Sequence, residues 1–502
     1  MMKGEHGLPA GTPVSLDWEG YIQRGGGFGI YRNVTYDTHE EMPHLKVEVL
    51  AGHYIVSASD GKLSFQYYED NERLTSFADK PLPDAWGNPL KVDHLIKMND
   101  TKLVLVGSNS MLPITIKDDF DGTNHHIDAV YGQLTRIFNS RDPIFAHADN
   151  LDGDRVAYIF EDLANFKIMA GFGTWVGEGK EARMQLSDPV VAAEEGVYSY
   201  HGVAGMSTEK FIIAATGFKN NGTGPIEEPF APIRMKVGQI DWFSKKVVFS
   251  DWNIRVFSDN VNWFALDNFN DRMAVIAYYD HTEGDGVVAM AVFLDGDNLR
   301  YGGYTIIEHG GALKPESSQR MSLRILSHSR FGVVFPDASN NGNLIFMMGE
   351  RTDNNDMQRI GSNFIIARNN PKKKGYFWFA VAPIDWNHFV IVDSFDNNEG
   401  NYATANIGYH LAYPVGLTSD RSSKHIQFHG VFKYKDPKMK LVPGYVYYTN
   451  SMGRLIRGSP YGYNHGEFGN FYVVSRWTRE ICALHNQVGI AVSEKELLIR
   501  TY

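Results

Sequence analysis

Cysteine, excess basic charge and long hydrophobic runs are all scarce in this chain of 502 residues. Its single cysteine, Cys482, excludes an internal disulfide framework, so the fold must be held by burial and hydrogen bonds, and we expect synthesis in a reducing compartment. Acidic residues outnumber basic ones by 59 to 48, giving a net charge of −11, which argues against a nucleic-acid partner. No apolar stretch approaches the roughly 20 residues of a membrane-spanning helix, so we expect no membrane span.

Glycine and aromatic residues are abundant, with 49 Gly, 30 Phe, 26 Tyr and 9 Trp. This combination is typical of many short strands separated by tight turns. Hydrophobic residues make up 43% of the chain and charged residues 21%, which suits a chain that buries a sizeable core and excludes global disorder. The composition therefore predicts an all-β fold.

A short motif recurs seven times: a basic residue followed by a β-branched or aromatic run. An apolar run precedes each copy and a turn rich in Asn, Asp and Gly follows it, which predicts antiparallel strands. The copies lie 49 to 62 residues apart, and their basic residues are His53, Lys102, Arg155, Lys210, Arg272, Arg330 and His388. This spacing is the scale of one four-stranded sheet per copy.

One such sheet cannot cover both of its faces, so the repeats predict seven sheets packed face to face around an axis. That arrangement is a seven-bladed β-propeller. A pair of two-sheet sandwiches is the structural alternative, but it gives no reason for seven similar copies. The basic residues have two interpretations. Their stems could cover apolar surface while their heads reach water, which is the simpler account, or they could form a ring of cations that attracts an anion at one channel mouth.

The two ends of the chain resemble each other. Residues 11–24 and 444–457 match at a constant shift of 433, and both read as a strand, a glycine turn and a second strand. The glycine-rich run 25–29 lacks the helical pattern and the Gly-Lys-Ser/Thr of a phosphate-binding loop, so it reads as a linker into the first repeat. We therefore divide the chain into an N-terminal hairpin and linker (1–39), a propeller (40–425) and a small C-terminal β module (426–502).

The end segments resemble small β modules of bacteriophage and other viral tail-fibre and virion-surface proteins. The resemblance lies in the opening 8–16, the Pro-Gly turn with Tyr-Tyr at 443–448, and the closing 489–499, while the aromatic insertion 461–472 departs from the compact module. The repeats are similar in style to propeller-repeat chains of marine viruses and microbes. The resemblance implies a structural or receptor-binding virion component.

Catalytic and metal-binding signals are weak. Aspartates in or beside turns could form the carboxylate pair of a glycosidase, but each is more simply a turn former; these are Asp118, Asp119, Asp149, Asp152, Asp154, Asp251, Asp280, Asp295 and Asp297. The loop from Asp149 to Asp154 has the oxygen density of a calcium site without the distal Glu of an EF-hand, so a structural turn is the better interpretation and a bound Ca²⁺ stays open. Neither the histidines 125, 126 and 465 nor Cys482 forms a zinc pattern, and we assign no catalytic residue, metal or cofactor.

These features together favour a non-enzymatic structural or receptor-binding component of a virus-like particle. We expect assembly in the cytoplasm, location in the virion, and homo-oligomers that contact other virion proteins or a host-surface glycan or protein. Aromatic segments suit docking, although blade packing is the better explanation for any single one of them; they are 242–243, Trp252, 263–264 and 461–472. The alternatives are a carbohydrate-active propeller enzyme, with two carboxylates at the channel mouth, and a cellular lectin-like adhesin or scaffold, which would be cytoplasmic.

Overall fold

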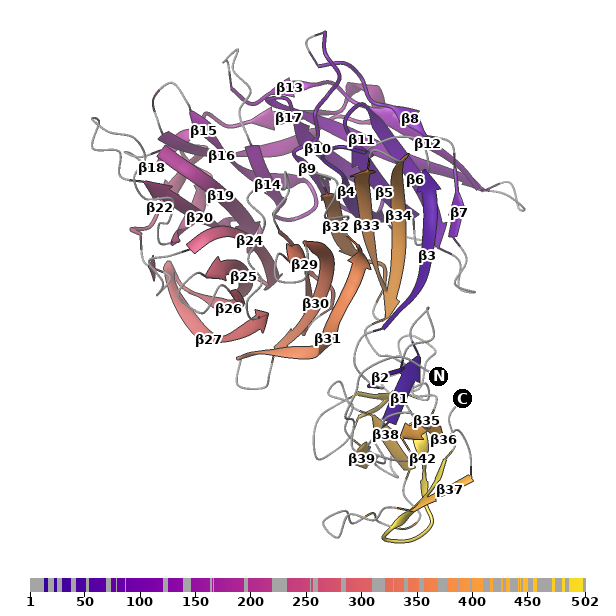
Figure 1. Cartoon of the computed structure of the whole chain (residues 1–502). Coiled ribbons are helices and arrows are strands. Elements are labelled where there is room, and N and C mark those ends of the chain that lie inside the picture. Colours follow the sequence, from indigo (N-terminus) through magenta and orange to yellow (C-terminus); the bar gives the residue numbers. More distant parts are fainter. Residues whose placement is uncertain are drawn as a thin grey trace.

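The chain folds as an all-β protein of antiparallel sheets, which confirms the fold class expected from composition and turn pattern (Figure 1). The computed structural model describes residues 13–16, 22–24, 29–37, 42–50, 54–68, 74–77, 79–85, 87–120, 125–138, 146–162, 165, 167–193, 197–218, 233–252, 254–255, 261–280, 286–308, 321–327, 329–337, 342–351, 356–368, 377–385, 388–397, 400–409, 416–418, 426–427, 430–433, 441, 443, 446–449, 455–457, 472–474, 481–483 and 487–499. Within these ranges the one helical element is a 3₁₀ turn at Gly179–Glu181.

Seven sheets share a core of four antiparallel strands, which are consecutive in the chain in six of them. The first three are β4 (Lys46–Leu50), β5 (Tyr54–Ser59), β6 (Lys62–Tyr68) and β7 (Leu74–Ser76); β9 (His94–Lys97), β10 (Lys102–Gly107), β11 (Ser110–Phe120) and β12 (His125–Tyr131); and β14 (Ala146–Asn150), β15 (Arg155–Asp162), β16 (Lys167–Val176) and β17 (Arg183–Leu186). The fourth is β19 (Val197–Gly205), β20 (Lys210–Phe218), β21 (Arg234–Asp241) and β22 (Lys246–Phe249). Short strands β8 (Lys80–Pro81), β13 (Thr135–Arg136), β18 (Val190–Ala193) and β23 (Ile254–Arg255) each add to the third strand of these four sheets.

The remaining three sheets keep the same order. They are β24 (Val261–Asn270), β25 (Met273–Asp280), β26 (Gly286–Asp295) and β27 (Asn298–Glu308); β28 (Ser322–Ile325), β29 (Arg330–Asp337), β30 (Asn343–Arg351) and β31 (Met357–Ala367); and β32 (Phe377–Pro383), β33 (His388–Asn397), β34 (Gly400–Tyr409) and β3 (Gly29–Asp37). Each predicted apolar run overlaps the first strand of a sheet, and each predicted basic motif begins or immediately precedes the second.

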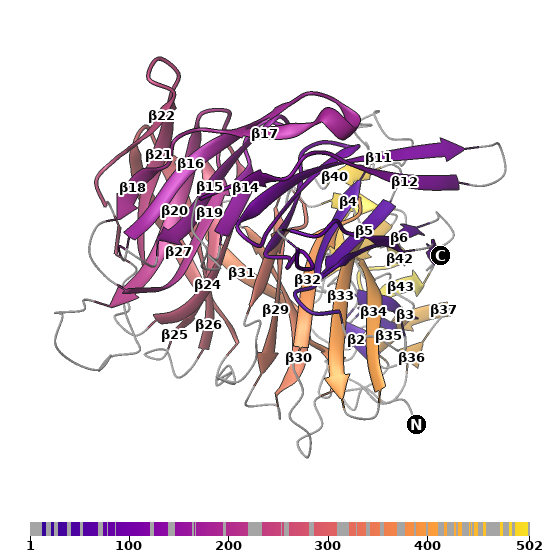
Figure 2. The ribbon, with the colours of Figure 1, turned by 90° about the horizontal axis from the view of Figure 1, so that it is seen from above.

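The first strands of the seven sheets, here called the inner strands, contact one another in sequence order. Contacts run from β4 through β9, β14, β19, β24 and β28 to β32, and β32 in turn contacts β4. The strand β3 connects the start of the chain to the last sheet. It pairs antiparallel with β34 and so supplies the fourth strand of that sheet. Figure 1 shows β3 beside β34 at the edge of the circuit, and Figure 2 shows the β11–β12 hairpin projecting from the second sheet.

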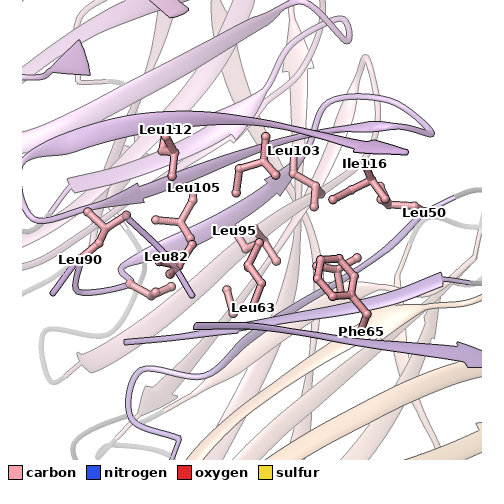
Figure 3. Close-up of a cluster of buried hydrophobic side chains, with 14 of the residues drawn as sticks. Leu50, Leu63, Phe65, Leu82, Leu90, Leu95, Leu103, Leu105, Leu112 and Ile116 are labelled. Carbon is pink, nitrogen blue, oxygen red and sulfur yellow. The ribbon is translucent and has the colours of Figure 1, made fainter. Parts of the chain in front are cut away.

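Hydrophobic clusters fill the space between each sheet and the next. The cluster between the first and second sheets contains Leu63 and Phe65 from β6 together with Leu103 and Leu105 from β10, all at most 1% exposed (Figure 3). Six further clusters join the remaining consecutive pairs, including the last sheet with the first. Burial on both faces explains why the second strands are almost continuously apolar.

The phenylalanine that follows the basic residue has a repeated role. In three sheets its ring covers the glycine directly opposite on the third strand, at the pairs Phe211 with Gly238, Phe331 with Gly349, and Phe389 with Gly408. A Cβ built on Gly349 or Gly408 would lie 2.1 Å from the phenylalanine Cζ, so any side chain there would displace the ring. Glycine and aromatic residues are therefore abundant in this chain partly because they pack as cross-strand pairs.

Five of the seven basic residues of the repeat contact other side chains, and four of them do so on the next sheet. The pairs that cross to the next sheet are Lys102 over the Trp175 ring (5.0 Å), Arg155 over the Trp242 ring (4.4 Å), Lys210 Nζ with Asp297 Oδ1 (2.7 Å) and the rings of His388 and Tyr68 (5.3 Å). Arg330 instead lies 3.4 Å from Glu350 of its own sheet. The charged heads therefore contact neighbouring side chains, mostly across the seams between sheets, which neither account from the sequence included; His53 lies outside the described residues.

Segments from both chain ends form further sheets. One comprises β1 (Pro13–Leu16), β2 (Ile22–Arg24), β35 (Gly416–Thr418) and β36 (Ile426–Gln427). A five-stranded sheet follows the order β37 (Gly430–Lys433), β43 (Glu496–Ile499), β42 (Gln487–Ala491), β38 (Val446–Thr449) and β39 (Leu455–Arg457), and β40 (Tyr472–Val474) pairs with β41 (Ile481–Ala483). We call these sheets the terminal module, which lies to one side of the seven sheets in Figure 1.

Two strand pairings cross the domain boundaries that the sequence suggested. The boundary at residue 39 separates β3 from the sheet that it completes, and it also separates β1 from its partner β35. Both pairings join segments that are far apart in the chain. Local turn and strand patterns carry no record of such partners, which is why the sequence placed β3 in a linker segment.

Candidate functional site

A charged cluster lies on the inner strands, where three sheets contribute one side chain each. Arg324 from β28 donates through Nη2 to Glu48 Oε1 of β4, and its Nε lies 3.9 Å from Asp267 Oδ2 of β24. Glu48 is 3% exposed and Asp267 is 7% exposed. Burial alone would lower the pKa of Arg324, but Glu48, Asp267 and Asp149 together raise it. One guanidinium thus serves two buried carboxyl groups.

Aspartates on the inner strands also bind the backbone of the next sheet. Asp149 Oδ2 accepts from Gly205 N at 2.7 Å, and Asp267 Oδ2 accepts from Ile325 N at the same distance. Asp93, just before β9, likewise accepts from the backbone of Ala146. Burial raises the pKa of both Asp93 and Asp149 to about 7 and also raises that of Asp267. Each of these carboxyl groups therefore joins one sheet to the next. We call Glu48, Asp149, Asp267 and Arg324 the inner-strand cluster.

Three histidines lie side by side on consecutive inner strands. His94 Nε2 of β9 is 3.0 Å from His147 Nδ1 of β14, and the ring centroids of His147 and His201, from β19, are 4.8 Å apart. Burial lowers the pKa of His94 to about 3 and holds that of His147 well below its ordinary value. The rings of His94 and His147 are therefore neutral at pH 7, so one donates to the other. No group of three His, Cys, Asp or Glu side chains in the described part of the chain could hold a metal ion.

The candidate carboxylates whose side chains the structure describes do not gather at one site. Asp149 alone among them belongs to the inner-strand cluster, whereas others bind their own partners: Asp118 with Tyr54, Asp152 with Arg155, Asp154 with Lys102, Asp295 with Arg300 and Asp297 with Lys210. The side chain of Asp119 lies outside the description, as do those of His125 and Cys482 and all of His465. His126 is exposed.

The loop from Asp149 to Asp154 is a turn closed by its own hydrogen bonds. Asn150 Oδ1 accepts from the backbone of Asp152 and Gly153, and Asp152 Oδ1 accepts from Asp154 and Arg155. Meanwhile Asp149 points to Gly205 on another sheet. The side-chain oxygens thus serve separate partners, as expected of turn-forming residues.

Sequence reasoning missed Glu48, Asp267, Arg324 and the three histidines. Each lies within the apolar run that precedes a repeat, in a segment otherwise made of strand-forming residues. A single polar residue at such a position is the available signal, because burial among apolar neighbours demands a partner. The identity of that partner could not be read, since Glu48 and Arg324 are separated by most of the chain.

The aromatic segments differ in how far their side chains are buried. Phe264 is 1% exposed, and Trp252 packs with its ring 4.7 Å from Lys236 Nζ, so both belong to the packing between strands. Phe243, in the turn between β21 and β22, is 99% exposed, and its neighbour Trp242 is 41% exposed. These two line a shallow cavity of about 440 Å³ together with Glu209, Gln239, Ile240, Asp241 and Val248. The insertion from 461 lies outside the described residues up to Phe471.

A further buried acid lies on β33. Asp393, 1% exposed, accepts at Oδ1 from the Thr404 hydroxyl and from Asn406 Nδ2 at 3.0 Å. Its Oδ2 has no hydrogen-bond partner among the described residues. Burial raises the pKa of Asp393 to about 7 against the two hydrogen bonds. No basic side chain among the described residues offsets this burial, so ionisation of the acid in the folded state is costly.

Replacing Asp393 by Asn should therefore stabilise the protein at alkaline pH. The folded acid keeps its proton to about pH 7 while the unfolded one loses it near pH 4, so the free energy of unfolding of the wild type falls as pH rises between these values. At about 1.4 kcal/mol per pKa unit, the advantage of the variant should grow by roughly 2 to 4 kcal/mol from pH 4 to pH 7. Urea unfolding at several pH values measures it. Asp128→Asn, at a 64% exposed site, is the control, and parallel pH profiles for wild type and D393N would contradict the assignment.

Comparisons with known proteins give weak likenesses only. No family model and no curated protein matches the chain. Among solved structures, a protein of unknown function from Dyadobacter fermentans is 10% identical, with 76% of this chain and 99% of that chain covered and a TM-score of 0.37. A lectin from Burkholderia pseudomallei is 10% identical, with 72% of this chain and 98% of the lectin covered and a TM-score of 0.39. Hydrazine synthase from Kuenenia stuttgartiensis is 7% identical, with 72% of this chain and 97% of that chain covered and a TM-score of 0.41. Likenesses of this size carry no functional inference.

Proposed function

We propose that the seven sheets are the blades of a β-propeller and that the chain is a non-enzymatic structural and ligand-binding component of a virus-like assembly. The circuit of inner-strand contacts, with a hydrophobic cluster between every consecutive pair of sheets, supports the propeller. The terminal module, built from both chain ends beside that circuit, is a second unit through which such a component could be anchored.

The observation that carries the non-enzymatic assignment is the saturation of the inner-strand cluster. Glu48 and Asp267 share Arg324, and Asp149 and Asp267 accept backbone N–H groups from the next sheet. A general acid or base needs a lone pair or proton free to reach substrate. These groups instead hold the sheets together, which is a structural role.

A lectin-like role is the second candidate, favoured by the cavity at the β21–β22 turn. Phe243 presents an uncovered ring, and Glu209 and Gln239 supply polar groups beside it. Exposed aromatic rings beside hydrogen-bonding side chains suit flat, hydroxyl-rich ligands such as glycans. Binding to a glycan array that is lost in Phe243→Ser would favour this role.

Sedimentation of native source lysate through a density gradient tests the virion assignment. We expect the chain, followed by mass spectrometry, to band with large particles at a fixed ratio to a capsid or tail protein. Recovery only as a small free species would overturn the assignment and leave the lectin-like role as the leading one.

No described helix is long and apolar enough to cross a membrane.

A further inference from the structure

The five-stranded sheet of the terminal module carries apolar side chains on its outer face. Val431 of β37 lies directly opposite Leu498 of β43, and Leu498 lies opposite Ile490 of β42 on its other side. Val431 is 50% exposed and Leu498 is 38% exposed, while Val492, just after β42, is 48% exposed. We call Val431, Ile490, Val492 and Leu498 the outer face.

The other face of the same sheet already has its core. Phe432, Leu497 and Ile499, which alternate with the outer-face residues along the strands, are at most 6% exposed in one hydrophobic cluster. The outer face is therefore no part of the packing of the module itself. Scattered exposed apolar residues are ordinary, but a row of adjacent ones on one sheet face marks an interaction site.

Charges around the outer face indicate what covers it. Lys433 is 75% exposed and lies 3.6 Å from Glu496, and Glu494 and Lys495 follow Val492, so two basic and two acidic side chains border the row. The whole chain carries −11, so two copies repel each other over most orientations. Where the two outer faces meet, their borders carry equal numbers of basic and acidic side chains, so the net repulsion between the copies is weakest there. Around a two-fold axis, a basic residue of one copy can face an acidic residue of the other.

The edge of the sheet is less suited to association than its face. Gln427 Nε2 donates to the carbonyl oxygen of Val431 at 3.2 Å, so one backbone acceptor of the end strand β37 already has a side-chain donor. A side chain that holds the backbone of an end strand makes the addition of another strand there less favourable. Face-to-face packing, with strands of the two sheets roughly aligned, needs no such change. Figure 1 shows β37 on the side of the terminal module away from the seven sheets.

We propose that the outer face packs against the outer face of a second copy of this chain, giving a two-fold dimer held by the terminal modules. The proposal deepens the proposed function, because an assembly component is expected to self-associate, but it rests on the face itself and needs no particle. The partner surface is therefore the same apolar row, bordered by the same two basic and two acidic side chains.

Sedimentation velocity of the purified full chain tests the dimer. Wild type should sediment at twice the chain mass of 56.5 kDa at micromolar concentration, and Leu498→Asp should sediment at the chain mass. Phe243→Asp is the matched control: it places the same charge on an apolar side chain that is 99% exposed elsewhere, and it should leave the dimer intact. Val431→Ser, a milder change on the neighbouring strand, should weaken dimerisation at least tenfold.

Thermal unfolding of each variant shows whether its fold is kept, so a monomer from Val431→Ser with an unchanged melting temperature supports the interface. A wild type that stays monomeric at 100 µM (about the upper limit for a specific weak interface), or a dimer that survives both Leu498→Asp and Val431→Ser, would overturn the proposal. A dimer found in the absence of any particle association would sink the virion assignment while leaving the interface in place.

Discussion

Replacing Arg324 by Met is expected to lower the free energy of unfolding by about 3 kcal/mol. The substitution leaves Glu48 and Asp267 buried without their common cation, and removing one partner of a buried ion pair typically costs about 3–5 kcal/mol. We place this case at the lower end because the Arg324 side chain keeps 31% exposure, so solvent screens part of the loss. Urea unfolding followed by tryptophan fluorescence measures the change.

The effect should depend on pH in a defined direction. Burial raises the pKa of both Glu48 and Asp267, so without Arg324 both acids become neutral at a higher pH than in the wild type. Neutral acids cost less to bury than ionised ones, so the destabilisation should shrink as pH falls from 8 to 5. A loss that is the same at both pH values would indicate lost packing of the arginine stem in place of lost charge pairing.

Two comparisons isolate the charge term. Arg300→Met removes an arginine that is 73% exposed and pairs with the 57% exposed Asp295, so it should change stability by less than about 1 kcal/mol. The triple variant Glu48→Gln, Asp267→Asn, Arg324→Met removes cation and anions together and should recover much of the loss. If R324M unfolds like R300M, the inner-strand cluster does not hold the sheets as described.

The elements of the repeat could be predicted from the sequence because their signals are local. A basic residue, the apolar run after it and the Asn/Gly turn lie within one stretch of chain, and burial between two sheets makes that run nearly continuous in Val, Ile, Phe and Ala. The structure accordingly begins β10, β15 and β20 at Lys102, Arg155 and Lys210.

Features that depend on distant pairing could not be predicted in this way. Glu48 and Arg324 meet because the circuit brings β4 near β28, and β3 reaches β34 because the two ends of the chain come together. Composition and spacing describe each element by itself. The candidate glycosidase aspartates are ambiguous for a related reason: a turn aspartate looks the same in sequence whether it bonds its own loop or faces a ligand.

Removal of β3 is expected to be more damaging than removal of the chain before it. The register of β3 with β34 runs from Gly29 opposite Tyr409 to Asp37 opposite Ala403, and at about 1 kcal/mol per backbone hydrogen bond its loss should cost on the order of 5 kcal/mol. A chain that begins at residue 40 would also leave β34 as an uncovered edge, which favours aggregation.

A chain that begins at residue 26 is the matched control for this experiment. It also lacks β1 and β2, so it shares every effect of removing them from β35, but it keeps β3. We expect the chain from residue 26 to unfold within a few degrees of the full protein and the chain from residue 40 to unfold far earlier or aggregate. A peptide of residues 26–40 added in trans should bind the shorter chain and restore much of the lost stability. Equal thermal unfolding of the two truncated chains, with no response to the peptide, would show that the circuit of sheets does not depend on closure by the N-terminal strand.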